Sequence, residues 1–189
     1  MSSTQATIFI VDISGYSRFV NEMDFDSGVS IVSELLGSIM ESNRLSFTVS
    51  ELEGDAVLFY KFGTPNTVEE ILRQFEDMLF AFDQVIQRYR LSIPQVGNLS
   101  VKVVVHYGKI GLFQLKGFSK LYGAPVITAH RLLKNKVNTH TYALITQAFI
   151  EAQARPFEGI PGVELCESYD VGRLCFTYFP FAPQFPVSA

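Results

Sequence analysis

A nearly continuous run of apolar residues close to the N-terminus, Ala6 to Val11, restricts the fold of this chain more than any other feature. The run reads ATIFIV, and its β-branched and aromatic side chains favour extended backbone. Because neither face of such a strand is polar, we predict a central strand that is buried on both faces of a sheet. Asp12 follows directly and Ser14-Gly15 comes soon after, so the strand is expected to end in a turn.

The rest of the chain alternates between helical and strand patterns. Apolar residues recur at helical spacing from Ile31 to Met40 and from Ile71 to Ile86, which predicts two long amphipathic helices. Shorter helices are expected at 16–23, 126–135 and 146–154, and further strands at 45–52, 56–62, 101–105, 110–115, 143–145 and within 169–179. This order predicts an α+β fold, with a ferredoxin-like βαββαβ core, a mixed and mostly antiparallel sheet, and helices packed on one of its faces.

Length and composition indicate one globular domain over residues 1–189, closed by an extended Pro- and Phe-rich tail at 180–189. Lys and Arg total 15 against 19 Asp and Glu, and this net charge of −4 argues against a nucleic-acid or membrane partner. Neither a signal peptide nor an apolar run of membrane-spanning length is expected, so we predict a cytoplasmic protein. Cys166 and Cys175 are then expected to be reduced thiols.

Two carboxylates stand at positions where they could serve chemistry. Asp12 ends the central strand just before a glycine turn and a helix start, where it could hold Mg²⁺ beside a phosphate or simply cap the turn. Asp55 lies in the Glu53-Gly54-Asp55 hairpin signal, where the residue type is typical of an ordinary turn. If the two strand ends were adjacent, the pair could share one divalent ion, or two ions as in phosphoryl chemistry. Periodicity alone does not show whether they are adjacent.

Four motifs in order resemble those of the class III nucleotidyl cyclases, the adenylyl and guanylyl cyclases. The segment Asp12-Ile-Ser-Gly-Tyr-Ser17 resembles their D-I-x-G-F-T signature, and Glu53-Gly-Asp-Ala56 resembles their G-D-A hairpin. Val104-Val-His-Tyr-Gly108 resembles a G-I-H-x-G strand and turn, and Tyr122 to Leu132 resembles a W-G-x-x-V-N-x-A-x-R-L helix start. The likeness covers residues 6–145, about three quarters of the chain. The chain also resembles a bacterial family of cyclase-like proteins of unknown function.

The resemblance implies a site and an assembly. Asp12 and Asp55 would bind two Mg²⁺ or Mn²⁺ ions, which activate a ribose 3′-hydroxyl and hold the triphosphate of a nucleoside triphosphate. Ile13 and Gly15 would lie along the phosphates. Arg131 would reach in from the other subunit of a head-to-tail homodimer and stabilise the developing negative charge.

Three positions depart from the cyclase pattern. The family's transition-state Asn falls on Ile127, which has no hydrogen-bond donor to offer. The base-selecting Lys of adenylyl cyclases falls on Glu51, which is the residue type of guanylyl cyclases, and the adenine-selecting Asp falls on Lys120. Glu51 and Lys120 could pair with each other across the dimer. These departures leave the selected base open.

Three functions are therefore compatible with the sequence. The first is a metal-dependent cyclase that converts a nucleoside triphosphate to a 3′,5′-cyclic nucleotide. The second is a catalytically silent cyclase-like domain that binds a nucleotide or a partner and signals by its conformation, and the third is a dimerisation module with no ligand. His130 and His140 lack ligand spacing, which argues against a zinc site, and His106 is expected to be a packing residue.

Overall fold

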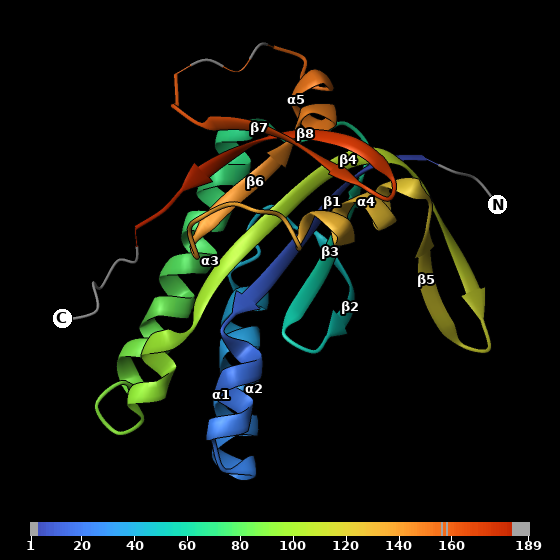
Figure 1. Ribbon diagram of the computed structural model, residues 1–189. Coiled ribbons are helices and arrows are strands. Elements are labelled where there is room, and N and C mark those ends of the chain that lie inside the picture. Colours follow the sequence, from blue (N-terminus) through green and yellow to red (C-terminus); the bar gives the residue numbers. More distant parts are fainter. Residues whose placement is uncertain (1–3, 156, 158, 183–189) are drawn as a thin grey trace.

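The computed structural model describes residues 4–155, 157 and 159–182, which form an eight-stranded sheet flanked by helices (Figure 1). The strand order is β2-β3-β1-β4-β6-β8-β7, and β5 pairs with β4 alone. The strands are β1 (Thr4–Ser14), β2 (Thr48–Glu53), β3 (Ala56–Phe62), β4 (Ser100–Leu115), β5 (Phe118–Tyr122), β6 (Tyr142–Thr146), β7 (Val163–Tyr169) and β8 (Gly172–Pro180). The helices are α1 (Tyr16–Glu22), α2 (Phe25–Glu41), α3 (Val68–Tyr89), the 3₁₀ turn η1 (Pro94–Asn98), α4 (Ala124–Leu132) and α5 (Gln147–Glu151). The α+β fold and the mostly antiparallel sheet are confirmed.

The central strand is buried on both faces, as its composition predicts. β1 lies between β3 and β4 and pairs antiparallel with both. Phe9 and Val11 point into one apolar cluster and Ile8 and Ile10 into another, and all four side chains are fully buried. The end of β1 is thereby held in place from both sides, so the residues that follow start from a fixed position.

The helices lie on both faces of the sheet, which corrects the expectation of one helical face. α1, α2, α3 and α5 cover the face that carries Phe9 and Val11. α4 packs on the opposite face, where Ala129 and Leu132 join the cluster around Ile8. Because α4 is short, it covers this second face of the sheet only near β1 and β4.

Strand β4 is longer than expected, and a further strand follows it. β4 runs unbroken from Ser100 to Leu115, whereas the sequence suggested two strands separated by a turn at 107–109. β5 folds back on the far half of β4, and this β4–β5 hairpin extends beyond the main sheet (Figure 1). Gly108 permits the close approach of α4, because a Cβ there would lie 2.5 Å from Pro125 Cγ.

The two cysteines are joined in a disulfide, which corrects the expectation of reduced thiols. Cys166 in β7 and Cys175 in β8 face each other in the register of an antiparallel hairpin. The sequence pattern around 169–179 did not reveal β7, so this juxtaposition could not be foreseen. Of the predicted tail, Phe181 packs edge-on against Phe75, whereas residues 183–189 lie outside the described residues. No described helix is long and apolar enough to cross a membrane.

Candidate active site

Asp12 and Asp55 lie next to each other at the end of the central strand. Asp12 pairs in register with Ala56, the residue after Asp55, and the amide of Ile13 donates to the carbonyl oxygen of Asp55 at 3.1 Å. Partial burial and, secondarily, the negative charge of Asp12 raise the pKa of the Asp55 carboxyl above its ordinary value. The fold therefore brings together the two carboxylates whose adjacency the sequence could not show.

Lys102 completes this cluster, and sequence reasoning missed it. It faces Asp12 in the β1–β4 register, and its Nζ lies 3.1 Å from Asp12 Oδ2. The same ammonium donates to the carbonyl oxygen of Leu133, just beyond α4, at 3.2 Å. Both charged side chains are about one-sixth exposed. The two carboxylates and Lys102 thus carry a net charge of −1, in a place where solvent screening is reduced.

The carboxylates of Asp12 and Asp55 suit a hard divalent cation whose coordination shell is completed by other ligands. Carboxylate oxygens are preferred by Mg²⁺, which usually binds one or two carboxylates and keeps waters or takes substrate phosphates for its remaining positions. Within residues 4–155, 157 and 159–182, no three His, Cys, Asp or Glu side chains form a complete metal cage. Asp12 and Asp55 could therefore hold such ions only together with ligands from outside this side-chain pair.

The turn after Asp12 requires glycine. Gly15 has φ +85°, and a Cβ at this position would lie 2.6 Å from the carbonyl oxygen of Asn98 in η1. Gly15 also starts α1, since the amide of Phe19 donates to its carbonyl oxygen at 3.0 Å. The Ile13 side chain is buried in the core. Only the backbone of Ile13 could therefore contact a ligand at the site.

Glu51 and Lys120 form an ion pair within one chain, rather than across a dimer. The pair joins β2 to β5. A second contact, between Glu53 Oε2 and His130 Nδ1 at 3.6 Å, joins β2 to α4. The side chains at the two positions that the cyclase likeness assigns to base selection are therefore paired with each other in this conformation.

Arg131 and Ile127 both lie on α4, and among the described residues neither side chain forms a hydrogen bond or ion pair with Asp12 or Asp55. The Arg131 guanidinium donates to Asp170 Oδ2 at 2.7 Å, which ties α4 to the turn between β7 and β8. Ile127 is 52% exposed, although it is apolar. Both side chains are thus presented at the surface of α4.

His106 is a packing histidine, as predicted. It is buried in β4, and its Nδ1 lies 2.9 Å from Thr146 Oγ1. Burial lowers the pKa of the imidazole from 6.5 to about 4, so the ring is neutral near pH 7.

Sequence comparison finds a family and one relative. A family model described as "Protein of unknown function (DUF2652)" matches residues 32–142, which is more than half of the chain. An uncharacterized protein of Mycobacterium tuberculosis, Rv2561/Rv2562, is 30% identical over 129 residues. That alignment covers 61% of this chain and 57% of the mycobacterial protein, so the chain spans little more than half of that relative's length.

Solved structures of nucleotidyl cyclases share the fold. The adenylyl cyclase CyaB from P. aeruginosa superimposes with a TM-score of 0.69 at 15% identity, covering 98% of both chains. The guanylyl cyclase Cya2 gives 0.66 at 13% identity over 94% of this chain and 92% of its own. The guanylate cyclase domain of RhGC from Catenaria anguillulae, solved in complex with GTP, gives 0.65 at 14% identity over 97% and 100%. At these identities the likeness establishes the cyclase-domain fold and nothing finer.

Proposed function

We propose that this chain, which belongs to the DUF2652 family of proteins of unknown function, is a divergent metal-dependent nucleotidyl cyclase. It would convert a nucleoside triphosphate to a 3′,5′-cyclic nucleotide and pyrophosphate. The observation that carries the proposal is the adjacency of Asp12 and Asp55 at the end of the central strand of a cyclase-domain fold. Paired carboxylates at such a strand end suit the binding of divalent ions and phosphates.

The roles of the residues follow from charge and position. Asp12 and Asp55 would hold Mg²⁺ or Mn²⁺, two ions per active site by the cyclase likeness, and these ions would neutralise phosphate charge and acidify the ribose 3′-hydroxyl. The 3′-oxygen would then bond to the α-phosphorus as the bond to the bridging oxygen of the β-phosphate breaks. Lys102, beside Asp12, offers a positive charge to a phosphate oxygen. The backbone at Ile13 and Gly15 would follow the phosphates.

Arg131 acts in this proposal from the partner subunit of a homodimer. Its position on the surface of α4 leaves it accessible to a second copy of the chain. A guanidinium directed at the phosphorus would stabilise the negative charge of the transition state. Because nucleoside triphosphates are cytoplasmic metabolites, the proposed activity would require the active site to face the cytoplasm, although that compartment disfavours a disulfide such as Cys166–Cys175.

A second candidate function is a catalytically silent domain that binds a nucleotide or a partner. Two observations favour it. Ile127 supplies no hydrogen bond where the cyclase likeness places an Asn, and losing one such donor costs about 10²–10³ in rate. Arg131 is also engaged by Asp170 of its own chain. The Glu51–Lys120 pair leaves base selection open under either function.

Product analysis tests the proposal. The purified protein is incubated with Mn²⁺ and ATP, GTP, CTP or UTP in turn, and cyclic products are identified by mass spectrometry. We expect one cyclic nucleotide, which is lost in Asp12→Asn and retained in Asp26→Asn, a matched change at an exposed position in the first turn of α2. Binding of a triphosphate without any product would favour the silent domain. Neither product nor binding would leave a dimerisation module.

A further inference from the structure

The disulfide between Cys166 and Cys175 closes a part of the β7–β8 hairpin, residues 166–175, that we call the hairpin tip. β6 pairs with β8 only from Phe176 to Pro180. Within the tip, the described strand that pairs with β8 is β7 alone. An isolated two-stranded hairpin is marginally stable in water, so the disulfide contributes to holding the two strands of the tip together.

The disulfide is accessible to a reductant. Cys166 is exposed and Cys175 is half-buried. Because successive side chains of a strand point to opposite faces, Cys175 and its neighbour Leu174 point to opposite faces of β8. Leu174 packs against the apolar cluster to which α4 contributes, so the disulfide lies on the other face of the hairpin. A thiolate can therefore reach a sulfur atom of the bond while the core stays closed.

The hairpin tip also contacts α4 and the segment that follows it. Asp170 Oδ2 accepts a hydrogen bond from the Arg131 guanidinium at 2.7 Å. Glu167 Oε1 accepts from the amide of Lys136 at 3.0 Å, and Glu167 Oε2 accepts from the Tyr169 hydroxyl at 2.7 Å. Figure 1 shows the turn of this hairpin beside α4. The disulfide and the contacts to α4 thus belong to the same short piece of chain.

The Arg131–Asp170 ion pair is too exposed to hold the hairpin tip in place by itself. Its side chains are 45% and 60% exposed. Exposed ion pairs contribute little to stability, because water screens the charges and ordering two side chains costs entropy. The hairpin tip therefore sets the position of Asp170, and the ion pair depends on the tip being held together.

We propose that Cys166–Cys175 is a redox-controlled bond, and that its reduction by a dithiol protein frees Arg131 from Asp170. A thiolate of the reductant attacks the Cys166 sulfur, the S–S bond breaks, and Cys175 leaves as a thiolate that takes up a proton. The second thiolate of the reductant then attacks the reductant's own sulfur in the mixed disulfide and releases Cys166, which is also protonated. The protein gains two electrons and two protons, and the reductant becomes a disulfide.

The consequence for turnover rests on the proposed cyclase function, whereas the disulfide exchange and the release of Arg131 do not. In the oxidised protein, Arg131 stays paired within its own chain and is withheld from a second copy. In the reduced protein, the tip has lost its cross-link and the guanidinium is available to the active site of that copy. A bond of this kind fits the cytoplasm, where disulfides are usually transient and redox-sensing.

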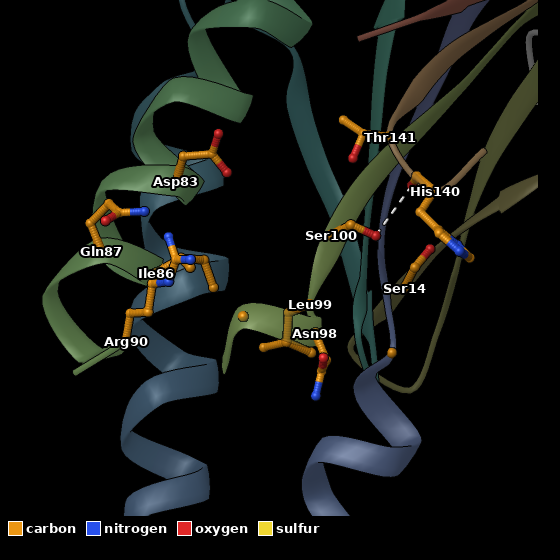
Figure 2. Close-up of a pocket in the computed structure, with 12 residues that line it drawn as sticks. Ser14, Asp83, Ile86, Gln87, Arg90, Asn98, Leu99, Ser100, His140 and Thr141 are labelled. Atoms are coloured by element: carbon orange, nitrogen blue, oxygen red, sulfur yellow. Dashed lines mark hydrogen bonds between the residues drawn. The ribbon is translucent and has the colours of Figure 1, made fainter. Parts of the chain in front are cut away.

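Hydrogen exchange of the full chain tests the loosening of the tip. One sample is prepared with oxidised glutathione and one with dithiothreitol, and alkylation with mass spectrometry counts the free thiols. We expect no free thiol in the first sample and two in the second, with amide exchange across 167–174 about tenfold faster or more. Exchange across 140–146 is the internal reference and should not change, because this segment enters β6 at the end of β8 remote from the tip. Ser100 Oγ also donates to the His140 carbonyl oxygen there at 3.3 Å (Figure 2).

Variants separate the disulfide from the ion pair. The double variant Cys166→Ser, Cys175→Ser should exchange like the reduced protein, and dithiothreitol should not change it further. The NMR signal of the Arg131 side-chain Nε–H, identified by its loss in Arg131→Lys, should shift on reduction. It should shift in the same direction in oxidised Asp170→Asn and stay in place in Glu164→Gln, an exposed change in β7.

Turnover is measured separately, so that a failure of the cyclase function is distinguishable from a failure of the redox proposal. Reduction should raise cyclic-nucleotide formation about tenfold or more. If no product forms in either state while reduction still loosens the tip and shifts the Arg131 signal, the redox control stands without the cyclase. The proposal is overturned if both cysteines stay free in the oxidised sample, or if dithiothreitol does not open the bond in the folded protein. It is equally overturned if reduction changes neither the exchange of 167–174 nor the Arg131 signal.

Discussion

Lys102 shows how a single residue decides the charge of the candidate site. Its ammonium lies between Asp12 and the end of α4, and it contacts the Asp12 carboxylate at 3.1 Å. The places of Asp12 near the end of the central strand and of Asp55 in a hairpin turn were predictable because each lies in a short local motif. Lys102 was not, because its partner is set by the register of two strands that are distant in the sequence. The same holds for the Arg131–Asp170 and Glu51–Lys120 pairs.

Replacing Lys102 should destabilise the protein. Lys102→Met leaves the largely buried Asp12 carboxylate without the ammonium that balances it, beside a second carboxylate. We expect a loss of about 1–3 kcal/mol in the free energy of unfolding, measured by urea denaturation at pH 7. Lys109→Met, on the exposed part of the same strand, is the control and should change stability by less than about 0.5 kcal/mol. Equal stability of the Lys102→Met and Lys109→Met proteins would contradict a stabilising role for the Asp12–Lys102 ion pair.

His106 should make the stability of the fold depend on pH. The folded-state pKa of about 4 lies below the ordinary 6.5, so between these values the unfolded chain binds the proton that the folded protein excludes. Stability is therefore complete above pH 6.5 and falls as the pH drops towards 4, by up to about 3 kcal/mol from this group. His106→Gln should show a shallower acid loss in urea titrations. Parallel curves for the two proteins would mean that folding does not lower the pKa of His106.

Helices and strands with a strong local sequence pattern were predictable. Strands that depend on pairing with a neighbouring strand were not. The two long amphipathic helices and the central strand follow from hydrophobic periodicity, and they fall where expected. β5 and β7 carry exposed side chains and little alternation, so their existence depends on β4 and β8 beside them. The placement of α4 on the opposite face is a tertiary property as well, because one short apolar stripe fits either face.

The N-terminus of α3 offers a test of local helix energetics. Thr67 Oγ1 accepts from the amide of Glu70 at 3.2 Å, and Glu70 Oε2 accepts from the amide of Thr67 at 2.8 Å, which forms a capping box. Thr67→Ala should cost about 1 kcal/mol, because one amide of the first turn loses its partner. Thermal or urea unfolding measures this loss. Thr64→Ala, an exposed change three residues earlier, should leave stability unchanged; if it costs as much, the cap is not the cause.

For the whole molecule, the exposed apolar surface around β5 and α4 predicts self-association. Phe118, Tyr122 and Ile127 are 72%, 74% and 52% exposed, on a hairpin that extends from the sheet and on the helix beside it. We expect a homodimer by analytical ultracentrifugation, and the double variant Phe118→Ser, Tyr122→Ser should be monomeric. Phe25→Ser, which removes an 82% exposed ring from α2, should remain dimeric. A monomeric unchanged protein would contradict this assembly, and with it the role of Arg131 from a partner subunit.

The central claim is that Asp12 and Asp55 bind a nucleoside triphosphate through divalent ions, and equilibrium binding tests it most directly. Binding of ATP, GTP, CTP and UTP is measured with and without Mn²⁺ for the unchanged protein, for Asp55→Ala and for Asp26→Ala as the control. We predict Mn²⁺-dependent binding of at least one triphosphate, abolished in Asp55→Ala although its circular dichroism and melting temperature stay close to those of the unchanged protein, and retained in Asp26→Ala. Equal binding by Asp55→Ala would contradict the assignment of this carboxylate pair as the metal and nucleotide site.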